Sequence, residues 1–366
     1  MNTLLYLVYG EAEHFHLELT YSVLTAVARS GDANDFRIVL ACEENVRRDD
    51  LPVEHLPFSK EEFLGWTFGG RFLHAAKIGA LKKAAATYDG KLALIDTDTY
   101  FVKSPSEIFD RIDSLHVVLH RAEGPLALYG QVQAYRKIMA NYSGHYSFDE
   151  ANHMFNASVI GMADRAKTLL DEVARLTKDL LDISPTNLHT LEQFAFGVVL
   201  GSRFEIKTCD DLVRHYSGWT RRFVHRRIRK IIPEFSEAAL NAAFADTRDV
   251  DVLPQQRKID VVRSRIKAWQ RPGLNDFAFA YLCYLSAFNT RSCTEANAWA
   301  DTALDFITYN DYPRALVAAD FERFRADRFD VLDWMESSTR DRWAAYWRAS
   351  PSNDLTAVTT TSPALR

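Results

Sequence analysis

The chain has 366 residues, of which 47% are hydrophobic and 25% charged, and its net charge at pH 7 is -5. This length suits one large domain with an extension, or two domains, and the mild acidity excludes a general nucleic-acid-binding protein. The four cysteines lack metal-ligand spacing and are too few for a disulfide scaffold. We therefore expect a reducing compartment and a cytoplasmic protein.

The N-terminal part of the chain alternates between predicted strands and helices. An apolar run that ends at Tyr9-Gly10 predicts a buried first strand, too short for a signal peptide or a membrane span. No later run reaches the ~20 apolar residues of a spanning helix. Further strands are predicted at 36–41, 92–95, 115–120 and 157–162, and helices at 15–30, 72–86, 131–140, 165–181 and 190–200. This alternation predicts an α/β domain with a largely parallel sheet.

The composition shifts after about residue 214, and from 235 to 349 the pattern is helical throughout, without a repeat period. We therefore predict a domain at 1–232 and a C-terminal α-helical extension at 233–349. The tail at 350–366 is dominated by Thr, Ser and Pro, and we expect it to be disordered.

The most informative segment is the apolar run at 92–95, which leads directly into Asp96-Thr97-Asp98. Because ligands bind at the carboxyl ends of parallel strands, both carboxylates are expected in a ligand crevice. Two neighbouring carboxylates repel unless a cation lies between them, and hard oxygen ligands favour Mg2+ or Mn2+. Two alternatives remain. The aspartates could form a turn or a helix cap. The chain could also be a phosphatase of the haloacid-dehalogenase type with Asp96 as nucleophile, although Tyr100 stands where that type has Thr.

Several other polar features accompany this pair. Tyr9-Gly10 ends the first strand, where a tyrosine can stack on a base and a glycine lets backbone approach a ligand; a simple turn is an equal alternative. The spacing of Arg71, His74 and Lys77 predicts cations along one side of a helix, suited to a phosphate site or to solvated surface charge.

Two later segments add hydrogen-bonding and coordinating groups. Asn156 and Ser158 precede a buried strand and can donate hydrogen bonds to sugar hydroxyls. The imidazole of His215 can complete the coordination of a metal held by two carboxylates, and Gly218 allows backbone amides to approach a diphosphate. A lone histidine is more often a surface or core residue, so the assignment of His215 depends on its companions.

The order of these elements resembles that of GT-A nucleotide-sugar glycosyltransferases, over residues 3 to 225. The closest resemblance is to the glycogenin and bacterial lipopolysaccharide galactosyltransferase type. The motifs that carry it are Tyr9-Gly10, the basic helix, Asp96-Thr97-Asp98, Phe155-Asn156-Ala157-Ser158, Glu192-Gln193 and His215-Tyr216-Ser217-Gly218. The resemblance implies a Rossmann-like mixed sheet and a nucleotide-sugar donor, with UDP as the expected nucleotide.

The resemblance also implies roles for individual residues. A metal ion, Mn2+ or Mg2+, would be held by Asp96, Asp98 and His215 against the diphosphate, and Arg221 falls where that type carries a lysine touching the diphosphate. Tyr9 would face the uridine, and Arg71 or Lys77 would lie near the phosphates or the sugar.

The sequence departs from this type in three places. Arg221-Arg222-Phe223 replaces Lys-Pro-Trp, Ser158 replaces a glycine, and Glu192 replaces an aspartate. Stereochemistry stays open: Gln193 could lie beneath the anomeric carbon of a retaining enzyme, and Glu192 is the candidate base of an inverting one.

The basic segment at 214–230 and the extension allow several partners. The segment could hold an anionic acceptor, such as a glycan or a lipid-linked sugar of bacterial surface polysaccharide synthesis, or contact an anionic membrane peripherally at its inner face. The alternative is a helix face paired with acids of the extension. The extension itself could be an acceptor platform or an oligomer interface. A non-catalytic sugar-nucleotide-binding protein is a further alternative.

Overall fold

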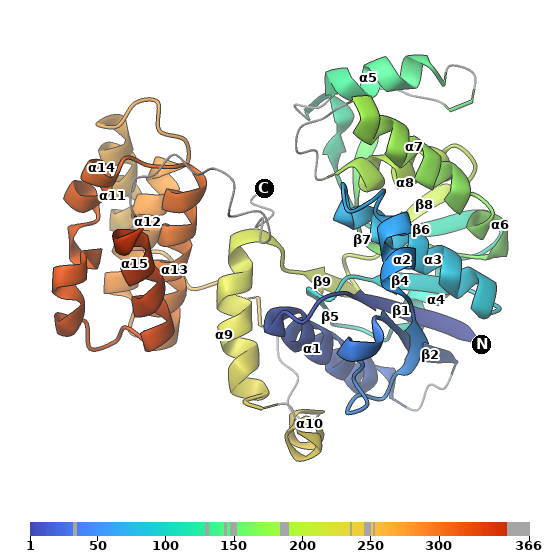
Figure 1. Cartoon of the computed structure of the whole chain (residues 1–366), viewed down its shortest axis with the longest axis horizontal. Helices are drawn as coiled ribbons and strands as arrows, with labels where there is room; N and C mark the ends of the chain where they lie inside the picture. The colour runs from blue at the N-terminus through green and yellow to red at the C-terminus, as the bar shows by residue number, and fades with distance from the viewer. Residues whose placement is uncertain are drawn as a thin grey trace. The chain divides into compact units, whose positions relative to one another are not determined.

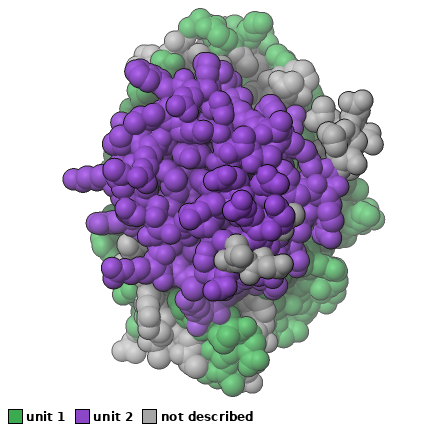
Figure 2. Space-filling model, turned by 90° about the vertical axis from the view of Figure 1, so that its left-hand side faces the viewer, with its two compact units in different colours: residues 1–216, 231–248 green, residues 217–230, 249–366 purple. Residues whose placement is uncertain are grey.

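The computed structural model describes residues 1–31, 35–128, 132–142, 145–146, 152–183, 190–234, 236–244, 250–251 and 253–349. The chain divides into two compact units, 1–216 with 231–248 and 217–230 with 249–366 (Figure 2). These limits differ from the expected ranges of 1–232 and 233–349, because 217–230 groups with the helical unit and 231–248 with the first unit. The tail predicted to be disordered lies outside the described residues.

The first unit is an α/β domain built on a seven-stranded sheet of order β3-β2-β1-β4-β7-β6-β8 (Figure 1). Its strands are β1 (Asn2–Val8), β2 (Phe36–Cys42), β3 (Glu54–Pro57), β4 (Leu92–Ile95), β6 (His116–Pro125), β7 (His153–Met162) and β8 (Glu205–Thr208). Most neighbours are parallel, but β7 runs antiparallel to both β4 and β6. The predicted α/β class is confirmed, and the sheet is mixed rather than parallel throughout.

The central strand β4 lies between β1 and β7 and is buried on both faces, since its side chains alternate between the two faces and all four residues are buried. One face of the sheet contributes Leu5, Val39 and Leu94 to a core shared with helices on that side. On β1, the alternate residue Tyr6 is also fully buried and its hydroxyl hydrogen-bonds Ser22 of α1 at 2.9 Å. Burial on both sides is the reason that these strands read as continuous apolar runs.

Helices of the first unit cover the sheet and fix its loops. They are α1 (Glu13–Ser30), α2 (Lys60–Trp66), α3 (Ala76–Thr87), α4 (Ser106–Asp110), α5 (Val132–Ala140), α6 (Asp164–Lys167), α7 (Leu170–Ile183), α8 (Leu191–Gly201) and α10 (Glu237–Phe244). The single helix predicted at 165–181 is therefore two helices. A Cβ atom at Gly79 would lie 2.0 Å from Cγ of Trp66, so only glycine lets α2 pack this closely on α3.

The helix predicted at 72–86 begins later than expected. A 3-10 turn, Leu73–Ala75, precedes α3, which starts at Ala76. Of the three cations expected along one helix side, only Lys77 therefore lies on the α-helix, and the predicted alignment of Arg71 and His74 with it is wrong. Gly69 and Gly70, both at positive φ, form a turn just before Arg71, so the helix begins after it.

A separate two-stranded sheet joins segments that are distant in the sequence. Strand β5 (Thr99–Phe101) pairs antiparallel with β9 (Val213–His215), and Thr99 lies opposite His215. This pairing carries β9 back to the end of β4, which positions the site described below.

The second unit is helical. Its helices are α9 (Arg221–Ile231, of which residues 221–230 belong to this unit), α11 (Lys258–Trp269), α12 (Phe277–Asn289), α13 (Cys293–Tyr309), α14 (Arg314–Asp320) and α15 (Ser337–Arg348). Aromatic side chains dominate its core, in which Trp299 and Trp343 are fully buried. The predicted α-helical extension is confirmed as a helical unit. None of the described helices is long and apolar enough to cross a membrane.

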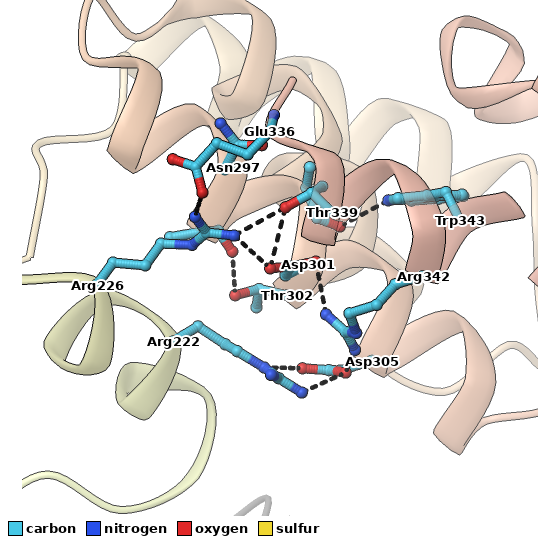
Figure 3. A network of polar contacts seen from close by, with 12 residues as sticks. Arg222, Arg226, Asn297, Asp301, Thr302, Asp305, Glu336, Thr339, Arg342 and Trp343 are labelled. Carbon is cyan, nitrogen blue, oxygen red and sulfur yellow. Dashed lines mark hydrogen bonds and ion pairs between the residues drawn. The ribbon is translucent and has the colours of Figure 1, made fainter. Parts of the chain in front are cut away.

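Ion pairs between α9, α13 and α15 hold this unit together (Figure 3). The buried carboxylate of Asp301 lies 2.8 Å from Arg226 and 2.6 Å from Arg342. Asp305 accepts two hydrogen bonds from Arg222, at 2.8 and 3.1 Å. Arg226 also pairs with Glu336, and Arg227 with Glu295. Three of the seven cations of the predicted basic segment are thus paired with acids of the helical unit, as the alternative of pairing with acids anticipated.

Candidate metal centre

Asp96 is fixed at the carboxyl end of the central strand by its own backbone. Its N–H donates to the carbonyl of Ser158 at 2.8 Å, which extends the ladder between β4 and β7 by one residue. Its carbonyl accepts a hydrogen bond from the hydroxyl of Thr99 at 2.7 Å, closing the turn into β5. The carboxylate therefore projects from a rigid strand end, where a parallel-type sheet places its ligand crevice.

His215 reaches the aspartates because β9 pairs with β5. Its Nε2 lies 3.3 Å from Oδ2 of Asp98, and the next backbone N–H, that of Tyr216, donates to the carbonyl of Asp98 at 3.1 Å. The side chains of His215 and Asp98 are only 9% and 11% exposed. Asp96, Asp98 and His215 each offer a ligand atom, and these atoms lie within 4.8 Å of one another. Two carboxylates and an imidazole form a donor set that can hold a divalent metal ion.

Lys77 adds a cation to this cluster. Its Nζ lies 2.7 Å from Oδ2 of Asp96 and donates to the carbonyl of Ala157 at 3.2 Å. Burial alone would lower the pKa of Lys77, but the carboxylates of Asp96 and Glu192 raise it above its usual value. The ammonium therefore stays charged and holds Asp96 in a fixed rotamer.

Burial raises the pKa of Asp96, an effect that Lys77 opposes and the neighbouring Asp98 reinforces. A divalent cation between the two aspartates would remove this repulsion, since it favours the ionised form of both. The electrostatics thus fit a metal ion at this position.

Two buried groups beside the cluster were not identified from the sequence. Glu18 of α1, which is 0% exposed, accepts a hydrogen bond from the hydroxyl of Thr97 at 3.2 Å, between the two aspartates. His120 of β6 hydrogen-bonds the carbonyl of Val213 at 2.9 Å through Nε2, and its ring meets that of His215 edge-on at 5.7 Å. Burial lowers the pKa of His120 to about 4, so the imidazole is neutral at pH 7. The sequence gives no signal for Glu18, because α1 also contains Glu13, His14 and His16.

The segment Asn156–Ser158 and the start of α8 form the neighbouring wall. Asn156 donates to Glu123 at 2.9 Å through Nδ2 and accepts from the N–H of Ser158 at 3.0 Å through Oδ1. The Oε1 of Gln193 accepts from the N–H of Ala157 at 3.0 Å. Glu192 is 2% exposed and acts electrostatically on Lys77. These predicted site residues therefore lie at the same edge of the sheet as Asp96.

A cavity of about 510 Å3 opens beside Gln193. It lies between α8 and β7, and Gly197 forms part of its wall. A Cβ atom at Gly197 would contact only Phe155, at 3.7 Å, so there is room for a side chain at this position. Its other lining residues include Met154, Phe194 and Phe204. Its polar lining comes from Asn152, His153 and Ser202 as well as from the Gln193 amide, so the cavity is mixed in character.

The structure places three predicted binding residues of this unit as follows. The ring of Tyr9 packs 4.8 Å from that of Phe63, and the N–H of Gly10 donates to Glu43 at 3.1 Å. Arg71 forms an ion pair with Asp182 of α7 at 2.9 Å, and its side chain is 53% exposed. Arg71 is thus held by a surface carboxylate, whereas Lys77 contacts the cluster.

Gly218 and Arg221 belong to the helical unit. Gly218 has a φ of 69° and opens the turn into α9, and Arg221 is the first residue of that helix. Their roles toward a diphosphate stay predictions.

No protein-family profile and no curated protein matches this sequence. The solved structures to which this chain is similar include the following glycosyltransferases. Apo mouse xyloside xylosyltransferase 1 is 12% identical over 57% of this chain and 86% of its own, with a TM-score of 0.39.

Two structures of LgtC give similar values. An active-site mutant is 13% identical over 57% of this chain and 72% of its own, with a TM-score of 0.38. The galactosyltransferase in complex with donor and acceptor sugar analogues is 12% identical over 68% and 85%, with a TM-score of 0.38. Because these TM-scores lie below 0.5, the function proposed below depends on the geometry of the site.

Proposed function

We propose that the protein is a metal-dependent glycosyltransferase that moves a sugar from a nucleotide-sugar donor, with UDP as the nucleotide, to a glycan or lipid-linked acceptor. The observation that carries the proposal is the cluster of Asp96, Asp98 and His215 at the carboxyl end of β4, with Lys77 beside it. Synthesis of bacterial surface polysaccharide or another glycoconjugate is the biological role that we favour.

The chemistry requires charge stabilisation at the leaving group. Breaking the bond between the sugar and the diphosphate develops negative charge on the diphosphate, and a metal ion at Asp96, Asp98 and His215 would neutralise it. Lys77 would add a second cation that is already fixed 2.7 Å from Asp96. Interactions that strengthen as this charge develops accelerate the reaction, since they are stronger in the transition state than in the ground state.

Other residues receive roles from the resemblance and from their surroundings. Tyr9 and Gly10 would border the uridine, and Asn156 and Ser158 the sugar hydroxyls. In the helical unit, Gly218 and Arg221 would meet the diphosphate. Arg71 would contribute only if it left Asp182.

Two residues of α8 are the candidates for action at the anomeric carbon. The Gln193 amide is oriented by the N–H of Ala157. Because the amide is uncharged, it could lie beneath the anomeric carbon in a retaining reaction, which requires no strong base. Glu192 would be the base of an inverting reaction. The acceptor would enter through the cavity beside Gln193, because its hydroxyl must reach the anomeric carbon.

The proposal is tested by incubating the full chain with Mn2+ and a panel of UDP-sugars and measuring released UDP. We expect turnover with one sugar, lost with EDTA and in Asp98→Asn, and retained in Asp171→Asn, a matched change on the exposed surface of α7. UDP binding without turnover would instead identify a sugar-nucleotide-binding protein. Hydrolysis of a generic phosphoester that is lost in Asp96→Asn would identify the phosphohydrolase.

A further inference from the structure

Helix α11 of the helical unit carries an unusual apolar stripe on its solvent side. Ile259, Val262, Ile266 and Trp269 are 48%, 54%, 54% and 91% exposed. Their spacing of three, four and three residues places them on one face of a helix with 3.6 residues per turn. Single exposed apolar side chains are ordinary, but four in a row on a 12-residue helix form a contiguous patch.

The opposite face of α11 fixes the helix in this orientation. Asp260 and Ser264 are 0% and 2% exposed, and Asp260 accepts a hydrogen bond from Asn289 of α12 at 3.0 Å. At the C-terminal end, Lys267 and Arg271 both pair with the buried carboxylate of Asp320, at 2.7 and 2.6 Å. The polar anchors of α11 therefore point into the unit, and the apolar stripe points out.

Cations flank the stripe on both sides. At 100° per residue, Lys258 and Arg265 fall on one edge and Arg263 on the other, and all three are exposed. The single acidic residue of the helix, Asp260, is buried on the opposite face. The solvent face of α11 is thus apolar at its centre and positively charged along both borders.

We propose that α11 is a peripheral membrane-binding helix that lies flat on an anionic lipid surface. The stripe would enter the boundary between headgroups and acyl chains, and the flanking cations would meet lipid phosphates. Trp269 at the end of the stripe is the residue type that membrane interfaces favour. This assigns membrane contact to α11 instead of the basic segment at 214–230, three of whose arginines are paired with Asp305, Asp301 and Glu295.

A second copy of the chain fits this surface less well. If two stripes packed together, the cationic borders of both helices would face each other, and the acid of α11, Asp260, is buried on its opposite face, so the contact is unfavourable. An anionic surface complements both the apolar centre and the charged borders. The charge pattern therefore favours lipid over a second protein molecule.

The test uses the full chain and sedimentation with vesicles of phosphatidylcholine, with or without phosphatidylglycerol. We expect binding to the anionic vesicles, weakened by high salt. Arg263→Gln with Arg265→Gln should lower the partition coefficient on the order of tenfold or more, since each basic residue contributes about fivefold. The matched pair Arg291→Gln with Arg328→Gln, also exposed in this unit, should bind like the wild type.

The apolar part is tested by Ile266→Asn with Trp269→Ser, compared with Tyr309→Ser, which removes a 60% exposed aromatic ring elsewhere in the unit. We expect loss of vesicle binding only in the first variant, with unchanged circular dichroism and thermal unfolding. Equal binding by all variants, or none by the wild type, would overturn the proposal. A second result would also overturn the proposal. In it, the wild type does not bind vesicles and is a dimer in sedimentation velocity, and the variant Ile266→Asn with Trp269→Ser is a monomer.

Discussion

Lys77 and Asp96 form a partly buried ion pair, with Nζ 2.7 Å from Oδ2, on the same carboxylate that a divalent cation would use. The other two members of the cluster, Asp98 and His215, approach each other at 3.3 Å. A metal ion and an ammonium can share one carboxylate because it has two oxygens. The pair thus orients one oxygen and leaves the other available.

Replacement of Lys77 should separate metal binding from diphosphate binding. In Lys77→Met we expect Mn2+ binding to persist at pH 8, since the three ligands remain. UDP affinity in the presence of Mn2+ should fall by about tenfold or more, because a charge-assisted hydrogen bond contributes about 1.5–3 kcal/mol. Calorimetry measures both. Lys77→Arg is the control that keeps the charge, and UDP affinity equal in all three proteins would refute a phosphate-binding role.

The turn before β9 is held by Asp211, whose carboxylate accepts two hydrogen bonds from Arg111, at 2.7 and 2.9 Å, and one from Lys103 at 3.0 Å. Arg111, and to a lesser extent Lys103, holds the pKa of Asp211 well below its usual value of 3.8. Because the pKa is lowered on folding, the stabilising contribution is complete above pH 3.8 and is lost as the pH falls below it.

We therefore expect Asp211→Asn to lower the free energy of unfolding by about 1 kcal/mol at pH 7, a small value because the side chain is half exposed. Urea unfolding of both proteins from pH 7 down to pH 3 measures the difference. It should shrink only below pH 3.8. A constant difference, or one that grows on acidification, would mean that the ion pair is not its source.

Gly197 provides a way to block the cavity beside Gln193. A Cβ at this position meets only Phe155, at 3.7 Å, so Gly197→Leu should fold, and leucine is also a better helix former by about 0.8 kcal/mol. We expect transfer to an acceptor to be lost, while UDP binding and slow hydrolysis of the donor persist. Gly197→Ala is the control with nearly unchanged volume. Transfer that survives in Gly197→Leu would place the acceptor elsewhere.

Asp301 is the central acid of the helical unit. Its side chain is 6% exposed, and its removal leaves Arg226 and Arg342 without their shared partner. We expect Asp301→Ala to destabilise the unit by about 1–3 kcal/mol, because each arginine keeps a second carboxylate partner but loses a charge-assisted hydrogen bond. Asp301→Asn keeps the hydrogen-bond acceptor and should cost less. Tryptophan fluorescence during urea unfolding reports on this unit through Trp299 and Trp343; equal stability of both variants would contradict the expectation.

The sequence predicted the parts of the site that are local. Asp96 and Asp98 follow a continuous apolar run, and a buried strand with polar residues at its end has few structural alternatives. The α/β class and the helical unit followed from the same periodicity. Asn156 was identified from its place before a buried strand and Gln193 through a motif resemblance; Asn156 lies on β7, next to β4, and Gln193 on α8, which packs on β7.

The parts that could not be predicted depend on long-range pairing. Nothing in the residues around Val213 shows that β9 would pair with β5, yet this pairing brings His215 to Asp98. The antiparallel direction of β7 is likewise a property of the connections and not of its apolar pattern. Glu18 and His120 read as ordinary members of a helix and a strand, and only the packing shows that they border the cluster.

The most direct test of the metal-dependent nucleotide site is a calorimetric titration of the full chain with UDP, in the presence of Mn2+ and then of EDTA. We predict binding that requires Mn2+, that is lost in Asp98→Asn and in His215→Ala, and that is unchanged in Asp171→Asn. UDP binding of equal affinity with EDTA, or in Asp98→Asn, would contradict the account.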